Sequence, residues 1–129
     1  MSKKDTEFLF EKESYAIIGA AYDVFNALGP GHKELFYQKA LARYFQEHNI
    51  PFEKELQAKV CYRGEEVGIY RLDFLVFGKI VVELKKRKYF SQKDIRQVYA
   101  YLRAMNLKLG ILIHFGQDAV HKKRVVNIR

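Results

Sequence analysis

The 129-residue sequence has no tryptophan, two prolines and one cysteine. Because Cys61 has no second cysteine to pair with, an internal disulfide is excluded, which suits a reducing compartment. No apolar run approaches the roughly 18 residues of a membrane-spanning helix, and the polar start MSKKDTE is unlike a signal peptide. We therefore expect a cytoplasmic protein. With 49% hydrophobic residues the chain can build a core, and its length favours one domain, residues 1–129.

Acidic residues are scarce in the last third of the chain. Residues 1–85 hold 12 Lys and Arg against 13 Asp and Glu, whereas residues 86–129 hold 11 basic residues and only Asp94 and Asp118 as acids. Such a one-sided field favours a polyanionic partner, nucleic acid first. The alternative is a soluble protein that merely has a high isoelectric point, and charge alone does not choose between the two.

Hydrophobic periodicity predicts three helices and five strands. The helices are expected at 14–28 with Ser14 as cap, at 33–48, and at 92–105 with Ser91 as cap. The strands are expected at about 52–61, 67–76, 79–85, 108–115 and 120–128. Residues 1–13 are expected to form a loose arm, of which only Phe8, Leu9 and Phe10 could pack against the domain. The order of elements predicts an α/β or α+β sandwich. In it, a three-strand antiparallel meander is followed by a crossover helix and further strands.

Two acids and a lysine interrupt the apolar stretch RLDFLVFGKIVVELK. Asp73 lies on the first of its two strands, and Glu83 and Lys85 share one face of the second. Burying these charges is expensive, and a hard divalent cation such as Mg²⁺, with Mn²⁺ as a substitute, would explain them. The Leu84 carbonyl is a further candidate ligand, and Lys85 could orient water or stabilise a phosphate. The alternative is a surface salt-bridge lattice, but the apolar flanks favour interior strands.

Four residues outside this stretch have simple structural interpretations. Glu34 lies in the first turn of its helix, where an acid ordinarily complements the helix dipole. Gln97 and Tyr101 lie four apart on a helix flank, which by itself indicates a solvated glutamine and a half-buried tyrosine. His114 beside a buried strand is most simply a hydrogen-bonded structural residue.

Several spaced motifs together resemble the GxxExxY proteins, a group within the PD-(D/E)XK nuclease superfamily. The resemblance covers roughly residues 14–128. The motifs are Leu28–Gly31, the GHKELFY run 31–37, Tyr70–Asp73, Val82–Lys85, Gln97–Leu102 and Leu107–Ile113.

This resemblance implies a restriction-endonuclease-like core, a central mixed sheet flanked by helices. It implies that Asp73 and Glu83 are metal ligands, that Glu34 reaches the same metal, and that Lys85 is the catalytic lysine. Gln97 and Tyr101 would line the active site and the path of the nucleic acid.

The sequence departs from the resembled pattern in two places. The basic residues Lys86, Arg87 and Lys88 follow the lysine, where they could bind phosphate or let Lys86 compete with Lys85. His114 stands where relatives often have asparagine.

We therefore expect a metal-dependent nuclease that acts on nucleic acid, with DNA as the expected substrate. A non-catalytic nucleic-acid-binding module and an accessory subunit that meets an acidic protein are the alternatives. A homodimer is a further option, because cutting both strands of a duplex needs two sites.

Overall fold

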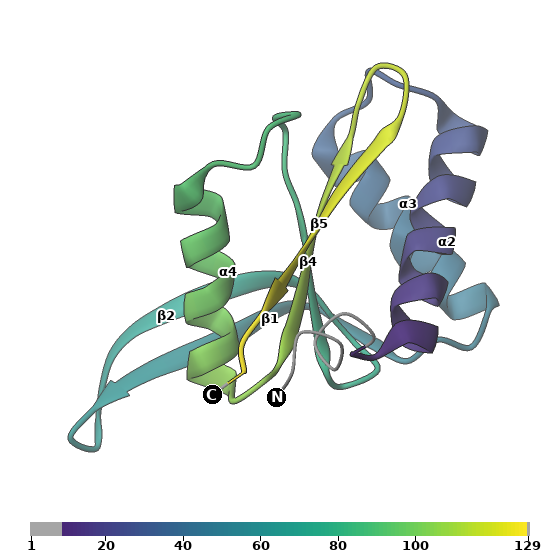
Figure 1. The fold of residues 1–129 in the computed structure, drawn as a ribbon. Helices are drawn as coiled ribbons and strands as arrows, with labels where there is room; N and C mark the ends of the chain where they lie inside the picture. The colour runs from purple at the N-terminus through teal and green to yellow at the C-terminus, as the bar shows by residue number, and fades with distance from the viewer. Residues whose placement is uncertain (1–8, 129) are drawn as a thin grey trace.

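The computed structural model describes residues 9–128, which form a five-stranded sheet with helices on both sides (Figure 1). Helix α4 lies on one side of the sheet, and α2 and α3 lie together on the other. The elements in chain order are α2 (Glu11–Leu28), α3 (Glu34–Glu47), β1 (Phe52–Tyr62), β2 (Glu65–Val76), β3 (Ile80–Leu84), α4 (Gln92–Met105), β4 (Leu109–Phe115) and β5 (Val120–Val126).

The sheet is mixed, with its strands in the order β1-β2-β3-β4-β5. The first three strands form an antiparallel meander, β3 and β4 are parallel, and β5 returns antiparallel to β4. The parallel pair requires a crossover connection, and α4 provides it. This is the predicted α/β, restriction-endonuclease-like arrangement.

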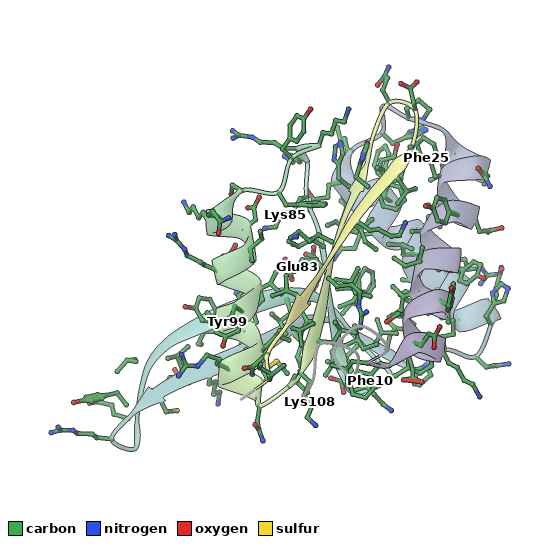
Figure 2. All side chains as sticks on the ribbon, viewed as in Figure 1. Phe10, Phe25, Glu83, Lys85, Tyr99 and Lys108 are labelled. Carbon is green, nitrogen blue, oxygen red and sulfur yellow. The ribbon has the colours of Figure 1, made fainter. Side chains whose placement is uncertain are left out.

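The central strand β3 separates two hydrophobic clusters. All five of its residues are buried, because helices cover both faces of the sheet there. Val82 and Leu84 pack into the cluster under α2 and α3, whereas Val81 packs against α4 with Val98. Since side chains alternate along a strand, Glu83 belongs to the α4 side, as Val81 does. Figure 2 shows Glu83 near the middle of the molecule.

Helix α2 begins three residues before the predicted cap, so the Ser14 prediction is wrong. The helix starts at Glu11 after Phe10, and the Ser14 N–H already donates to the Phe10 carbonyl at 2.8 Å. Leu9 and Phe10 pack against the core. This tertiary contact stabilises a first helical turn at residues 11–13, which the sequence pattern assigned to the arm. The rest of the predicted arm, residues 1–8, lies outside the described residues.

The other boundaries follow local signals closely. Ser91 caps α4 in a reciprocal capping box with Asp94, with both hydrogen bonds at 3.1 Å. The turn between β2 and β3 has left-handed backbone at Phe77 and Gly78, as a tight hairpin requires.

Within residues 9–128, no helix is long and apolar enough to cross a membrane.

Candidate active site

Asp73 and Glu83 face each other where β2 and β3 diverge. The antiparallel ladder pairs Val76 with Ile80 and runs to Phe74 opposite Val82. One step further, side chains replace the ladder: the Asp73 N–H donates to Glu83 Oε1 at 2.7 Å, and the Leu84 N–H donates to Asp73 Oδ2 at 2.8 Å. Each carboxylate therefore accepts a main-chain hydrogen bond from the opposite strand, and the two acids are held side by side.

The β1–β2 hairpin twists at the same point, so that residues on one face of β2 pack on different sides of the sheet before and after it. Leu72 and Phe74 are two residues apart and should share a face, yet Leu72 packs against the α4 cluster and Phe74 against the α2–α3 cluster. On β1, Glu55 has a left-handed φ of 55° and interrupts the pairing between Lys54 and Leu56. This irregularity in β1 lies opposite Asp73. It places the Asp73 side chain at the point where β2 and β3 separate.

Burial destabilises the charged forms of both acids. Burial, and next the charge of Asp73, raise the pKa of Glu83 to about 8. Burial also raises the pKa of Asp73, although the hydrogen bond from Leu84 and the charge of Lys85 oppose that shift. Glu83 is only 5% exposed. A buried, charged pair without a cation is therefore costly.

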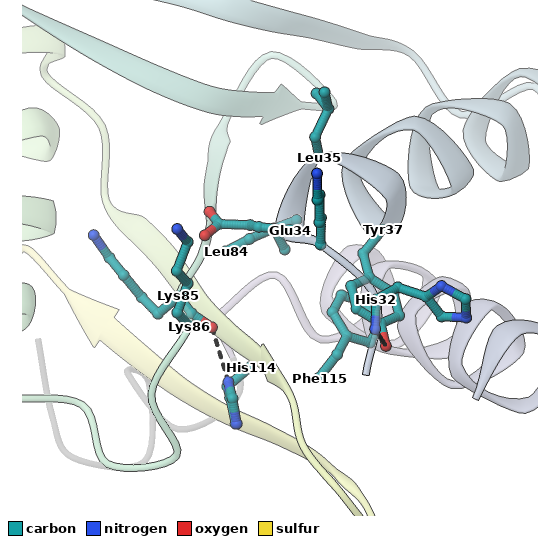
Figure 3. A pocket seen from close by; sticks show the side chains of 10 residues that line it. His32, Glu34, Leu35, Tyr37, Leu84, Lys85, Lys86, His114 and Phe115 are labelled. Carbon is teal, nitrogen blue, oxygen red and sulfur yellow. Dashed lines mark hydrogen bonds between the residues drawn. The ribbon is translucent and has the colours of Figure 1, made fainter. Parts of the chain in front are cut away.

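Glu34 approaches this pair from the α2–α3 side of the sheet, without joining it in a cluster. It is the first residue of α3, and Figure 3 shows its carboxylate pointing toward the end of β3 that carries Lys85. Burial, followed by the charge of Asp73, raises the pKa of Glu34, whereas Lys86 and Lys85 lower it. The helix-dipole interpretation holds for its position, but the side chain also interacts with the acidic pair.

Lys85 lies just beyond β3, which ends at Leu84 and not at Lys85 as predicted. Its main chain stays in register, since the Lys85 N–H donates to the Ile113 carbonyl at 2.8 Å. His114 donates from Nδ1 to the Lys85 carbonyl at 2.9 Å (Figure 3), so it is the hydrogen-bonded residue that the sequence predicted. The Lys85 Nζ lies 3.9 Å from Asp94 Oδ1.

Gln97 and Tyr101 have different surroundings. Gln97 is exposed and lines a groove with Lys85 and Lys86. Tyr101 is 4% exposed, packs edge-on against Tyr70 with ring centroids 4.9 Å apart, and hydrogen-bonds with Gln97. The Tyr101 ring is in the core, where Tyr70 of the twisted hairpin covers it. Burial, and next the charges of Glu83 and Asp73, raise the pKa of Tyr101, so it lies near the acidic pair, and its contact with nucleic acid stays a prediction.

The basic run remains on the surface beside the acids. Lys86, Arg87 and Lys88 are exposed. Lys85 and Lys86 line both a groove that contains Gln97 and a cavity of about 570 Å³ that Glu34, Tyr37 and His114 also line (Figure 3). That volume is within the range of small-ligand sites. Leu84, whose carbonyl is the further candidate ligand, also lines this cavity.

The predicted ligands do not form a ready-made three-residue metal cluster. Among residues 9–128, no three His, Cys, Asp or Glu side chains are grouped closely enough to hold an ion. Asp73 and Glu83 are the two that the structure brings together, and Glu34 is electrostatically coupled to both. A cation here would need water, the Leu84 carbonyl or a closer Glu34 to complete its ligands.

Two neighbours of the site were not predicted to serve it. Asp94 was not singled out, yet it caps α4 and faces Lys85. The signal was available in the Ser91–Asp94 capping-box spacing, which points the Asp94 side chain back toward the preceding loop. The charge of Glu55 on β1 acts on Asp73, and no local sequence pattern indicates that these two residues lie close together.

Comparison with known proteins gives a family match over most of the chain. The family model described as the PD-(D/E)XK nuclease superfamily matches residues 11–127. The uncharacterized protein MJ1664 of Methanocaldococcus jannaschii is 29% identical over 79 residues, which are 61% of this chain and 35% of that protein. The chain thus spans about a third of that relative's length. The crystal structure of SSO0001 superposes with a TM-score of 0.47 at 14% identity, over 88% of this chain and 76% of that one.

Proposed function

The chain belongs to the PD-(D/E)XK nuclease superfamily, and on that premise we propose that it is a metal-dependent nuclease that hydrolyses phosphodiester bonds in DNA. The observation that carries the proposal is the opposed pair of Asp73 and Glu83, each fixed by a main-chain N–H of the other's strand. The membership supports a nuclease in general. DNA as the substrate, and the narrower GxxExxY resemblance, remain predictions.

The donor set suits a divalent cation such as Mg²⁺ or Mn²⁺. Asp73 and Glu83 offer oxygen ligands, and within residues 9–128 no hydrogen bond reaches the second oxygen of either carboxylate. The raised pKa of Glu83 supports the same assignment, because a cation would offset both the burial and the charge of Asp73 that favour the protonated form. When bound, a divalent cation supplies Lewis-acid chemistry that offsets negative charge on a phosphate.

The surrounding residues fit distinct roles in phosphodiester hydrolysis. Asp73 and Glu83 hold the cation, and Glu34 and the Leu84 carbonyl complete its ligands. Lys85 orients the attacking water or stabilises the attacked phosphate, and its main chain is fixed by β4 for that purpose. Gln97 contacts the substrate from the groove that it shares with Lys85.

The basic run supports nucleic acid as the partner. Lys86, Arg87 and Lys88 are exposed directly after the lysine that we assign to catalysis. Contacts between such side chains and phosphates release counterions, so binding should weaken steeply as salt rises. A homodimer would supply the second active site that cutting a duplex requires.

The test is a cleavage assay on linear, single-stranded and branched DNA with Mg²⁺, Mn²⁺ or EDTA. Asp73→Asn and Lys85→Ala should each reduce cleavage by a factor on the order of 10² to 10³ or more, while DNA binding in EDTA survives. Lys79→Ala is the matched control, because Lys79 precedes β3 and also lies 3.9 Å from an acid, Glu13. Full cleavage by either site variant would contradict the assignment.

Metal binding can be measured without turnover. Mg²⁺ or Mn²⁺ should raise the melting temperature of the wild-type protein, because a ligand that binds only the folded state stabilises it. Asp73→Asn should abolish that rise, and Lys79→Ala should keep it.

A second candidate is a non-catalytic module that binds nucleic acid. Two observations favour it: Lys85 Nζ lies near Asp94, and the described acids do not form a three-residue cluster. Salt-dependent DNA binding without cleavage under any metal would support this module over the nuclease.

A further inference from the structure

We propose that Tyr89 is a stacking platform for an unpaired nucleobase, so that the protein engages a single-stranded segment of nucleic acid beside the acidic pair. This inference rests on the proposed function and deepens it, because it names the form of the substrate at the same site.

Tyr89 is the most exposed of the large hydrophobic residues in the described part of the chain, at 80%. Its neighbour Phe90 packs against the α4-side cluster and anchors the loop, so the loop does not need a second aromatic for its own stability. Lys88 Nζ lies 5.7 Å from the centroid of the Tyr89 ring. An aromatic ring beside a lysine, held out in solvent on an anchored loop, offers a base-stacking surface with a phosphate contact next to it.

Tyr89 lines two grooves. On one side, a groove leads to Lys85 and Gln97, next to the acidic pair. On the other side, a groove leads over the start of α4 to β5, where His121 and Lys123 share the α4-facing side of the strand. A strand that passes from the acids to β5 therefore crosses Tyr89.

The charged side chains along these two grooves suit a phosphate backbone. The first groove contains Lys86, Arg87 and Lys93 and a single acid, Asp94, and the second contains no acid. Asp94 is already used by the Ser91 cap and lies near Lys85. The positive side chains thus follow both grooves, and the aromatic ring lies between them.

The ring can stack only on a base whose face is free. Inside a duplex each base face is covered by its neighbours, so a long blunt duplex offers free faces only at its two ends, whereas a frayed end, an overhang or a single strand presents unpaired bases to Tyr89. Such stacking tolerates any base, because every base has a π-face. We therefore expect a preference for unpaired nucleic acid, without sequence specificity from this residue.

The experiment measures binding in EDTA, so that cleavage does not interfere. Oligonucleotides carry 2-aminopurine, whose fluorescence falls when it stacks, and they are tested as single-stranded DNA, single-stranded RNA, blunt duplex and duplex with an overhang. Tyr89→Ala should weaken binding of single strands and overhangs about 5- to 100-fold and remove the quenching. Blunt-duplex binding should change less than 2-fold, and Tyr89→Phe should behave as wild type.

Tyr62→Ala is the matched control. Tyr62 is 51% exposed at the far end of the β1–β2 hairpin, and Arg63 Cζ lies 5.0 Å from its ring centroid, so it also pairs an exposed tyrosine with a cation. This variant should bind single strands as wild type does. The DNA and RNA arms decide which single strand is preferred.

Two results would overturn the inference. Equal binding of single strands by Tyr89→Ala and wild type, or equal losses in Tyr89→Ala and Tyr62→Ala, would remove the stacking role. Neither result would affect the proposed nuclease, which is tested by the metal-dependent cleavage that Asp73→Asn should lose. Conversely, a wild-type protein that stacks 2-aminopurine but never cleaves would retain this inference and refute the nuclease.

Discussion

Asp73 and Glu83 are joined across the divergence of β2 and β3, since the Asp73 N–H donates to Glu83 Oε1 at 2.7 Å. The return bond, from the Leu84 N–H to Asp73 Oδ2 at 2.8 Å, makes the arrangement reciprocal. Because the strands diverge here, the N–H groups of Asp73 and Leu84 would have no carbonyl acceptor on the neighbouring strand. The two carboxylates accept their hydrogen bonds instead. The same bonds that satisfy the backbone orient the two acids toward one another, so stability and the proposed chemistry depend on the same two side chains.

Asparagine and alanine at position 73 should therefore differ in stability but not in activity. The side-chain amide introduced by Asp73→Asn keeps an oxygen for the Leu84 N–H, whereas Asp73→Ala leaves that half-buried donor without a partner, at about 1–3 kcal/mol. Both variants should lose cleavage. Urea unfolding in EDTA measures the difference, and equal stability of the two variants would show that the hydrogen bond contributes nothing.

Metal-free protein should lose stability as pH rises from about 4.5 toward about 8. Burial, and next the charge of Asp73, raise the pKa of Glu83 to about 8 in the fold, against 4.5 as its ordinary value. Between those values the folded state holds a proton that the unfolded state has released, so raising the pH favours unfolding.

Glu83→Gln cannot titrate and should flatten this part of the profile. The measurement is the melting temperature in EDTA at intervals between pH 5 and pH 8.5. Parallel profiles for Glu83→Gln and wild type would contradict the assigned shift.

His114→Ala should lower cleavage by disturbing Lys85 and not by touching the substrate. The bond from His114 Nδ1 to the Lys85 carbonyl, at 2.9 Å, fixes the main chain from which the lysine projects, and its loss should cost about 0.5–1.5 kcal/mol of stability. We expect a lower kcat with DNA affinity in EDTA unchanged.

His48→Ala is the control for this prediction. His48 makes the same kind of bond, from Nδ1 to the Tyr44 carbonyl at 3.0 Å, but at the end of α3. It should keep full cleavage. If both histidine variants lose cleavage in proportion to their lost stability, the role of His114 is structural only.

Gly110→Ala should destabilise the protein by about 1–3 kcal/mol. A Cβ at this position on β4 would lie 2.5 Å from Val98 Cγ1, and a buried, β-branched valine cannot rotate away easily. Gly19→Ala is the opposite case: nothing lies within 4 Å, and replacing a glycine inside α2 should gain about 0.5–1 kcal/mol. Thermal unfolding of the two variants tests whether α4 packs on β4 this closely.

Local signals were sufficient where the chain organises itself over a few residues. The Ser91 capping box, the Phe77–Gly78 turn and the apolar periods predicted α4 and the meander within a residue or two. Ser14 failed as a cap because contacts of Leu9 and Phe10 with the core extend α2 beyond the polar signal. Tyr101 was expected to be half buried from its helix flank, and only the twisted hairpin over it encloses it fully.

The sequence by itself determined that Asp73 and Glu83 would lie side by side, because a tight turn between two strands fixes which residues are opposite. It also determined that Lys85 would follow on the same face and that positive charge would begin immediately after it. These are consequences of backbone geometry over a short stretch.

The tertiary structure decided what approaches that pair from a distance. Glu34 arrives from a helix 39 residues before Asp73 in the sequence, Asp94 turns to Lys85, and His114 holds the Lys85 carbonyl from β4. No local period encodes these approaches, because they depend on how helices pack on the two faces of a twisted sheet. The same packing placed Tyr89 between two basic grooves.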